Sequence, residues 1–279
     1  MSLNAFILMI LLPFTLKAFS LQAEEKSPKY LAKTPISRPA EEEISNPKGE
    51  LFPETETAGY LLDDPVMKFT LERLFNDSSA TLTPEYIQSL GFTFLNQMGL
   101  HVLVAKHPGM HGYVFKFFQY NVFPGIDWRY WIQRVEGAKL IKEGIRQFGY
   151  EKLFKVPRKW LFKTPCLQVI EGRTYPSFIL IAEDMRLVPF EENQKLWRKK
   201  TTEATLIALH KMIKTYGLRD CARITNVPWC KDGKIAFVDT ETFHSTSLNY
   251  HPLVEFLSRK NKIRWEHIVH AGGDPMSPP

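Results

Sequence analysis

The chain has 279 residues and a formal net charge of +6 at pH 7, with 36 Lys and Arg residues against 30 Asp and Glu. Its hydrophobic content of 44% and aromatic content of 13% can fill the core of one large domain or two small ones, which excludes a wholly disordered chain. The positive residues form short clusters at 155–163, 195–200 and 259–264, separated by acidic residues. These clusters favour solvated faces over a nucleic-acid or lipid patch, and no motif supports nucleic-acid binding, so no nucleic-acid partner is expected.

The first 23 residues are predicted to form a secretory signal peptide. A mostly apolar run from Ala5 to Leu16 precedes Lys17 and two small-residue cleavage sites, the second ending at Ala23. The run has the length of a signal's apolar region and is too short to span a bilayer comfortably. The alternative is a buried N-terminal helix, which Pro13 does not favour. We therefore expect an exported protein, periplasmic or secreted, which stays anchored if the signal is uncleaved and has no later membrane span.

Residues 24–59 are predicted to be a disordered linker, because five prolines stand there among Lys, Glu, Ser and Thr with few large apolar side chains. Order is expected from about Tyr60 onward. Asp64-Pro65 and Thr83-Pro84 each combine a capping side chain with proline at the first helical position, which predicts two helix starts. The apolar positions that follow are Met67, Leu71, Leu74 and Phe75 in the first helix and Ile87 and Leu90 in the second.

Strands and a long helix are predicted next. Residues 100–105 and 113–118 have strand character and are joined by a turn that contains proline and glycine. A helix is expected from Asp127, its cap, to about Phe148, and Gly149 ends it.

The second half of the chain is predicted to add strands, a helix and a hairpin. They are two strands around Leu161 and at 178–182, an amphipathic helix from Thr201 or Thr202 to Tyr216, and a hairpin that joins 226–229 to 235–239. Gly217 ends the helix, and Asp232-Gly233 is a strong signal for a two-residue turn. This order of helices and strands predicts an α+β protein.

The open end of the predicted hairpin suggests a metal site. Counting outward from the Asp232-Gly233 turn pairs Asn226 with Asp239, with Cα atoms about 4.5 to 5.5 Å apart. An amide oxygen and a carboxylate so placed are hard ligands of the kind that Mg²⁺ needs on nucleotide phosphates. The alternative is that Asn226 only begins one strand and Asp239 only ends the other.

Lys116 lies in the predicted strand 113–118, which is apolar on both faces. A buried lysine in such a strand needs an anionic partner, either a carboxylate or a phosphate. The alternative is an edge-strand lysine that discourages aggregation. Glu136 is a candidate partner, because it lies on the next predicted helix with Ile132 and Leu140 four residues away on either side. The alternative for Glu136 is an ordinary exposed glutamate.

Three cysteines are too few for a disulfide framework, so at most one bridge is expected. Cys221 and Cys230, nine residues apart, are the favoured pair. Three unpaired thiols, Cys166 included, are the alternative of about equal weight.

The order of these residues resembles the protein-kinase-like superfamily, in the broad sense that includes aminoglycoside-phosphotransferase-like members. That family has a strand lysine on the nucleotide phosphates, a helix glutamate that holds the lysine, an apolar strand leading to a hinge, and a catalytic loop followed by a hairpin that ends in a metal-binding aspartate. The matching positions, within residues 90 to 245, are Lys116, Glu136, the strand from Ile179 with Glu183 and Met185 at the hinge, Asp220, Asn226 and Asp239.

The resemblance implies a protein-kinase-like bilobal fold with a reduced C-terminal lobe. Residues 60–185 would form the N-lobe with a helical extension, and residues 186–279 the reduced C-lobe. It also implies ATP and Mg²⁺ as cofactors, with nucleotide contacts from the strand lysine and the hinge. The implied roles are phosphate binding by Lys116, orientation of Lys116 by Glu136, cofactor binding by Glu183 and Met185, metal binding by Asn226 and Asp239, and positioning of the acceptor hydroxyl by Asp220.

Two departures from the family pattern leave two functions open. The family's catalytic aspartate stands five residues before the loop asparagine, at the position of Cys221, and Asp220 is one residue further back. Only Gly99 stands between Phe92 and Val104, so a glycine-rich phosphate loop is missing. The sequence therefore predicts either an ATP- and Mg²⁺-dependent phosphotransferase of unknown acceptor, or a pseudokinase that acts as a binding or scaffolding module for a protein partner.

Overall fold

The computed structural model describes residues 58–95, 102–118, 129–170 and 173–272, which belong to one compact unit of the chain. The signal peptide predicted over residues 1–23 lies outside the described residues, and so does the predicted linker up to residue 57. Within the described residues, no helix is both long enough and apolar enough to cross a membrane.

Groups of helices and groups of strands follow one another along the described chain, in the mixture that the sequence predicts. The helices are η1 (Ala58–Tyr60), α2 (Pro65–Leu74), α3 (Pro84–Ser89), α4 (Arg129–Gln147), α5 (Phe190–Lys199), α6 (Glu203–Tyr216), η2 (His251–Phe256) and α7 (Arg259–Ala271), where η marks a 3-10 helix. The strands are β1 (Thr93–Phe94), β2 (Val102–Lys106), β3 (Tyr113–Phe118), β4 (Phe154–Lys155), β5 (Lys159–Ile170), β6 (Arg173–Glu183) and β7 (Ile235–Ala236). The predicted α+β class is confirmed.

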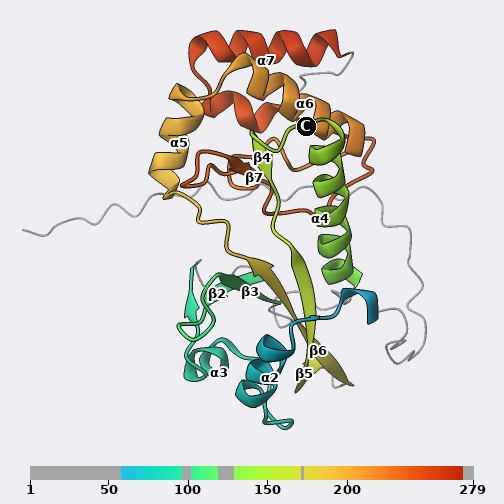
Figure 1. Cartoon of the computed structure of the whole chain (residues 1–279). Coiled ribbons are helices and arrows are strands. Elements are labelled where there is room, and N and C mark those ends of the chain that lie inside the picture. The colour runs from blue at the N-terminus through green and yellow to red at the C-terminus, as the bar shows by residue number, and fades with distance from the viewer. Residues whose placement is uncertain (1–57, 96–101, 119–128, 171–172, 273–279) are drawn as a thin grey trace, which may run out of the picture. The chain divides into compact units, whose positions relative to one another are not determined.

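Five strands form an antiparallel sheet with the order β1-β2-β3-β6-β5 (Figure 1). β2 and β3 confirm the first two predicted strands, and β3 spans the predicted residues 113–118. β5 and β6 confirm the strands predicted around Leu161 and at 178–182, but their ladder runs from Lys159↔Ala182 to Ile170↔Arg173 and is longer than expected. β4 and β7 form a separate parallel pair.

The sheet has two apolar faces, because side chains alternate along each strand. The first face packs with residues of α2 and α3 and carries Phe115, Phe117, Phe162, Ile179 and Ile181. The second face packs with the beginning of α4 and carries Phe118, Leu161, Phe178 and Leu180. By the same alternation, Lys116 on β3 and Lys159 on β5 belong to the second face.

Local capping explains why three helices begin where predicted. The Asp64 carboxylate accepts hydrogen bonds from two backbone amides of α2, at 3.0 Å each. Thr83 and Thr202 cap α3 and α6 in the same way. Gly217 ends α6 at φ 62°, a left-handed conformation that glycine adopts readily. Asp127, the predicted cap of α4, lies outside the described residues.

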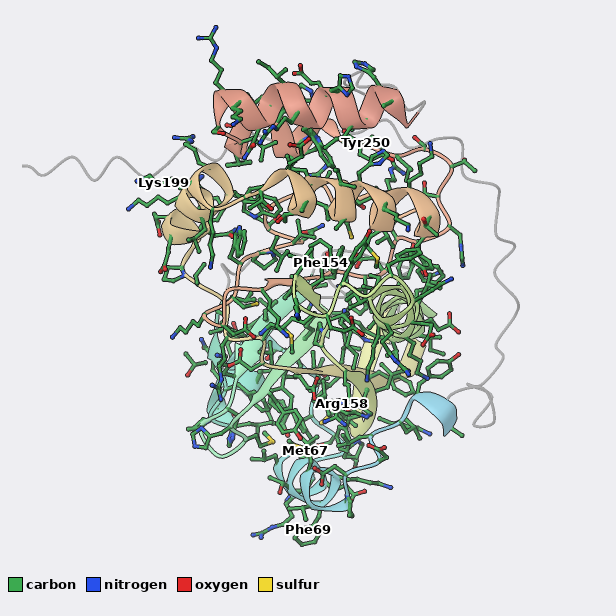
Figure 2. The ribbon with its side chains drawn as sticks, turned by 45° about the horizontal axis from the view of Figure 1, so that its top comes forward. Met67, Phe69, Phe154, Arg158, Lys199 and Tyr250 are labelled. Atoms are coloured by element: carbon green, nitrogen blue, oxygen red, sulfur yellow. The ribbon has the colours of Figure 1, made fainter. Side chains whose placement is uncertain are left out.

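The predicted apolar side of α2 faces the core. Met67, Leu71 and Phe75 are buried, and Leu74 is half-buried against them. Phe69 lies on the outer side of the helix and is exposed. Figure 2 labels both Phe69 and the buried Met67. Burial of one side of this helix covers the first face of the sheet.

A second core lies among α5, α6 and α7, and Phe154 and Tyr250 are part of it (Figure 2). α6 was predicted with its apolar side, whereas α5 and α7 were not predicted. Both unpredicted helices are largely polar, and their buried residues are Asn193 and Trp197 in α5 and Asn261, Trp265 and Val269 in α7. So few buried positions leave little apolar periodicity for a prediction.

The hairpin before Asp239 has a different register from the predicted one. Backbone hydrogen bonds join the Cys230 amide to the Lys234 carbonyl at 2.8 Å and the Val238 amide to the Asn226 carbonyl at 3.0 Å. The loop therefore holds three residues, and its third is a glycine at φ 79°, the left-handed conformation that such loops use. The predicted pairing of Asn226 with Asp239 is wrong by one residue, because Asn226 faces Val238.

All three cysteines are buried and unpaired. The favoured bridge between Cys221 and Cys230 is therefore not formed, and the alternative of three free thiols is confirmed.

Candidate functional site

Two lysines from the sheet reach the same segment of the chain. Lys116 of β3 pairs with Leu180 of β6, and Lys159 of β5 pairs with Ala182 of the same strand, so the lysines flank β6 on the face that α4 covers. Lys159 is 5% exposed, and the Lys116 side chain is 13% exposed. Two ammonium groups with so little access to water need oxygen atoms around them.

The oxygen atoms come from the segment Val238 to Glu241, which follows β7. Lys116 Nζ lies 3.6 Å from Asp239 Oδ1 and 3.5 Å from the Val238 carbonyl oxygen. Lys159 Nζ donates to the same carbonyl at 3.1 Å and to Thr240 Oγ1 at 2.7 Å. The structure thus brings together Lys116 and Asp239, which the sequence assigned to one site, and adds Lys159.

Arg134 of α4 holds both carboxylates of this segment. Its Nη1 donates to Asp239 Oδ1, and its Nη2 donates to Glu241 Oε1 at 2.9 Å. Its backbone carbonyl accepts a hydrogen bond from Thr240 Oγ1 at 2.6 Å. One residue therefore connects α4 to the backbone segment and to its two acidic side chains.

Gly137 allows α4 to approach so closely. A Cβ atom on Gly137 would lie 1.8 Å from the Thr240 carbonyl oxygen and 2.9 Å from its carbonyl carbon. No side chain fits at these distances, so glycine is required for the helix backbone to pack directly against the segment.

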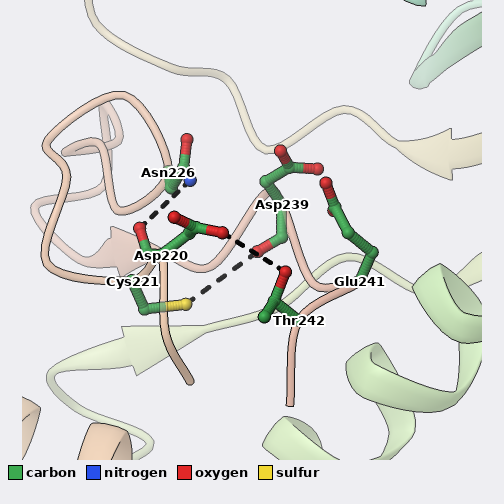
Figure 3. A pocket seen from close by; sticks show the side chains of 6 residues that line it. All are labelled: Asp220, Cys221, Asn226, Asp239, Glu241 and Thr242. Atoms are coloured by element: carbon green, nitrogen blue, oxygen red, sulfur yellow. Dashed lines mark hydrogen bonds between the residues drawn. The ribbon is translucent and has the colours of Figure 1, made fainter. Parts of the chain in front are cut away.

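Asp239 and Glu241 line a small hollow together with residues that follow α6 (Figure 3). The other lining residues are Asp220, Cys221, Asn226 and Thr242. Asn226 Nδ2 donates to the Asp220 carbonyl at 3.1 Å, and Thr242 Oγ1 donates to Asp220 Oδ2 at 3.3 Å. Three predicted site residues, Asp220, Asn226 and Asp239, therefore share one hollow, although the hairpin register that suggested two of them is shifted.

Cys221 stands where the resemblance to kinase-like proteins would place a catalytic aspartate, and a buried thiol cannot replace that group. Its residue exposure is 2%, and its Sγ lies 3.9 Å from the Asp239 carbonyl oxygen. Burial, with a smaller contribution from nearby carboxylates, raises the pKa of the thiol far above its ordinary value. The thiol stays protonated at neutral pH, so Asp220 is the ionisable group that this loop presents to the hollow.

Glu136 does not contact Lys116. The Tyr60 hydroxyl donates to the Glu136 carboxylate at 2.5 Å, and the carboxylate that Lys116 meets is that of Asp239. Residues two apart on a helix point about 200° apart, so the helix that directs Arg134 into the site directs Glu136 away from it.

Glu183 and Met185, the predicted hinge residues, lie where β6 ends and beyond it, and each has protein partners. The Glu183 carboxylate accepts from Arg158 Nε at 2.6 Å and from the Arg158 amide at 2.9 Å. The Met185 carbonyl accepts from Lys155 Nζ at 3.0 Å. Nothing in these contacts tests whether the two residues bind a cofactor, and that role stays a prediction.

The buried charges shift one another's pKa values. Burial lowers the pKa of both lysines, and that of Lys159 is lowered strongly because Lys116 adds repulsion. Burial alone would raise the pKa of Asp239, but the attraction of Lys116 and Arg134 lowers it well below its ordinary value. Burial raises the pKa of Glu241 to about 7, with the Asp239 charge adding to the rise and the Arg134 charge opposing it. At neutral pH, Asp239 is therefore ionised and Glu241 is only partly so.

The predicted Mg²⁺ ligands do not fit a metal ion in this arrangement. Asp239 Oδ1 accepts from Arg134 and lies beside Lys116, and the amide oxygen of Asn226 accepts a hydrogen bond from Thr225 at 3.2 Å. In the described part of the chain, no group of three or more His, Cys, Asp or Glu side chains is placed to hold a metal ion. The donor atoms are of the kind that Mg²⁺ prefers, but a guanidinium already contacts the carboxylates.

Glu241→Gln should stabilise the protein at alkaline pH and change little at acidic pH. The pKa of Glu241 is raised from 4.5 to about 7, so the folded state binds more protons than the unfolded state between these values. Stability therefore falls as pH rises through this window, and glutamine removes that loss while keeping an acceptor for Arg134. Urea unfolding in EDTA should show a gain of about 1 to 2 kcal/mol at about pH 8 and almost none at about pH 4. An equal effect at both pH values would contradict this assignment.

Comparisons with known proteins do not assign the chain to a family. No family model matches it, and no curated protein matches it. Among solved structures, the chain is similar to one described as the complex structure of Rv3197-erythromycin from Mycobacterium tuberculosis, with 15% identity and a TM-score of 0.33 over 78% of this chain and 62% of that chain. The chain thus covers less than two thirds of that protein. A similarity this low carries no argument about fold or function.

Arg134, Lys159 and Glu241 are absent from the predicted site. A signal for Arg134 exists, because it shares the helical spacing of the buried Trp131, Val135 and Ala138. An arginine inside an apolar helix stripe needs a carboxylate partner elsewhere in the chain. Lys159 has no comparable signal, since it begins a strand in one of the basic clusters that favour solvated faces.

Proposed function

We propose that this chain is a kinase-like protein, with a bilobal fold and a reduced C-terminal lobe, that binds the phosphates of a nucleotide at Lys116. The observation that supports the proposal is the meeting of Lys116 and Asp239 at 3.6 Å, beside a hollow that Asp220 and Asn226 also line. These four residues occur in the order that the kinase-like pattern requires.

The charge of the site supports an anionic ligand. The three cations Lys116, Lys159 and Arg134 surround two carboxylates. One of these, Glu241, has a pKa of about 7 and is only partly charged at neutral pH. The hydrogen-bond partners of Lys159 are uncharged oxygens. A phosphate would supply the negative charge that the buried ammonium groups lack.

Binding without turnover is the function that this geometry supports best. Cys221, buried and protonated, stands at the position of the catalytic aspartate. Arg134 contacts both carboxylates that would otherwise be available to a metal. The protein is then a pseudokinase, exported through its N-terminal signal peptide to the periplasm or beyond the cell, that serves as a binding or scaffolding module for a protein partner.

Phosphotransfer to an unknown acceptor is the second candidate, and the position of Asp220 favours it. Its carboxylate lines the same hollow as Asp239 and is held by Thr242 Oγ1 at 3.3 Å and by Arg223 Nε at 3.6 Å. In a phosphotransferase that uses ATP and Mg²⁺, this carboxylate would orient the acceptor hydroxyl, and Lys116 would neutralise charge on the phosphates.

Millimolar ATP should raise the Tm of the full chain by several degrees, and Lys116→Met should abolish the rise. A ligand at about 100 times its Kd stabilises a folded protein by about 2.7 kcal/mol, which corresponds to several degrees for a domain of this size. Lys199→Met is the matched control, because Lys199 is an exposed lysine of α5 (Figure 2). Differential scanning fluorimetry, with circular dichroism to confirm folding, makes the measurement.

An undiminished rise in Lys116→Met, or no rise in wild type and Lys199→Met, would contradict nucleotide binding at this site. An ADP-release assay then separates the two candidates. ADP production that is lost in Asp220→Asn while ATP binding remains identifies a phosphotransferase. ATP binding without ADP production identifies a pseudokinase.

A further inference from the structure

Two acidic side chains lie next to each other at the edge of the hollow. The carboxyl groups of Asp239 and Glu241 are close enough to shift each other's pKa, and Figure 3 shows them side by side. Adjacent carboxylates that are partly buried need a proton or a cation between them. In kinase-like sites and many others, that cation is a divalent metal.

The cation that contacts both carboxylates in this protein is the guanidinium of Arg134. Its two terminal nitrogens are divided between them, Nη1 on Asp239 Oδ1 and Nη2 on Glu241 Oε1. A guanidinium is planar and always charged, and its fork of donors matches two acceptor oxygens at once. Arg134 therefore bridges the two carboxylates through hydrogen bonds, as a metal ion would bridge them by coordination.

Packing and hydrogen bonds on α4 also fix the position of Arg134. Its side chain is 9% exposed, and its guanidinium carbon lies 5.6 Å from the centre of the Trp131 ring. Its backbone carbonyl is tied to Thr240, and Gly137 fixes the helix against the same segment. A side chain packed in this way is part of the site rather than a surface group that happens to reach it.

Positive charge already meets both carboxylates without a metal. Arg134 and Lys116 face the ionised Asp239 and the partly ionised Glu241, and Lys159 adds a further buried amine. A divalent ion between the carboxylates would displace the guanidinium and put two positive charges beside the lysines in place of one. We infer that Arg134 takes the place of a divalent metal ion between Asp239 and Glu241, so that the site binds phosphates without a metal.

Phosphate binding without a metal rests on the proposed function. The exclusion of a metal ion by Arg134 does not. Removal of the guanidinium should convert the pair of carboxylates into a metal site. Oε2 of Glu241 is buried and accepts no hydrogen bond from the described residues, so it supplies an oxygen ligand once Arg134 is gone. Mn²⁺ alone is the probe, because it prefers the same oxygen ligands as Mg²⁺. The concentration of free Mn²⁺ can be measured by electron paramagnetic resonance.

Full-length wild type should bind no Mn²⁺ at millimolar concentration, and its Tm should be the same in MnCl₂ and in EDTA. Arg134→Gln should melt below wild type in EDTA, should bind Mn²⁺ at least about tenfold more tightly than wild type, and should regain Tm on binding. The double variant Arg134→Gln/Asp239→Asn should lose this response. Arg146→Gln is the matched control, because Arg146 is an exposed arginine of the same helix, and it should behave as wild type.

Equal Mn²⁺ affinity in wild type and Arg134→Gln would overturn the inference, and so would a folded Arg134→Gln that does not bind Mn²⁺. If Arg134→Gln does not fold, Arg134→Lys replaces it. A single ammonium lacks the fork that holds two carboxylates, so a gain of Mn²⁺ affinity over wild type is again expected, and no gain overturns the inference.

ATP added in EDTA separates this inference from the proposed function. A rise in wild-type Tm with ATP but without metal, together with failure of the Mn²⁺ results, would leave nucleotide binding intact and remove the role of Arg134. The expected Mn²⁺ results without any ATP effect would keep Arg134 as the cation of the site and remove nucleotide binding.

Discussion

Gly137→Ala should lower the free energy of unfolding by about 3 kcal/mol, a large effect for the addition of one methyl group. The new Cβ would lie 1.8 Å from the Thr240 carbonyl oxygen. Neither side can move away easily, because Thr240 Oγ1 donates to the Arg134 carbonyl and accepts from Lys159. Since Thr240 lies between Asp239 and Glu241, the substitution should also displace the two carboxylates of the site.

Gly144→Ala is the matched control on the same helix. The nearest atoms to its Cβ, at 2.3 to 2.8 Å, belong to the end of the Tyr216 ring, which is a half-buried side chain that can rotate. Alanine also favours the helix over glycine by about 1 kcal/mol, which offsets part of the strain. Chemical denaturation should therefore show a change within about 1 kcal/mol for Gly144→Ala. Equal losses for the two variants would contradict the close backbone contact at Gly137.

Elements whose ends depend on neighbouring residues were predicted well. Asp64 and Thr202 cap the helices that follow them, and Gly217 ends α6. A cap is a contact between groups two or three residues apart, so the sequence contains all of its partners. The beginning of the strand around Lys116 was predicted for a related reason. Turn residues directly precede its run of β-favouring side chains.

Elements that depend on distant partners were missed. α5 is anchored by Trp197, whose indole nitrogen donates to the Val227 carbonyl at 3.2 Å, and α7 by Trp265, which donates to the Tyr250 carbonyl at 3.0 Å. Their remaining residues are mostly polar, so neither helix shows the apolar periodicity on which prediction relies. The hairpin register was missed because a three-residue loop and a two-residue loop fit the same turn residues.

Only part of this group of residues was named from the sequence. Asp220, Asn226 and Asp239 line one hollow, and Lys116 lies 3.6 Å from Asp239 Oδ1. Glu241, Arg134 and Lys159 were not named. The predicted helix partner, Glu136, has the wrong charge for the site. The side of α4 that faces the site is decided by packing, for example of Gly137 against Thr240. Family resemblance directs attention to an acidic helix residue, whereas the buried stripe of α4 carries Arg134.

Asp239→Ala should destabilise the protein by about 2 to 3 kcal/mol. Removal of one partner of a buried ion pair leaves the other charges without compensation, and here Lys116, Lys159 and Arg134 would have only Glu241. The effect should be at the lower end for a buried pair, because the Asp239 side chain is 31% exposed. Asp239→Asn keeps an acceptor for Arg134 and should lose less. Urea unfolding of both variants near neutral pH makes the measurement, and equal stability of wild type and Asp239→Ala would contradict the charge assignment.

Lys116→Met in the Asp239→Ala background should recover about 1 kcal/mol of the loss. In wild type, Lys116 has Asp239 at 3.6 Å, and its removal leaves Asp239 with Arg134 as a partner. In Asp239→Ala the same lysine is a buried charge beside two other cations, so its removal relieves repulsion rather than breaking a pair. The double-mutant cycle should therefore be non-additive by more than about 0.5 kcal/mol. Additive losses would mean that Lys116 is not coupled to Asp239, and the instability of Asp239→Ala would then come from Arg134 and Lys159.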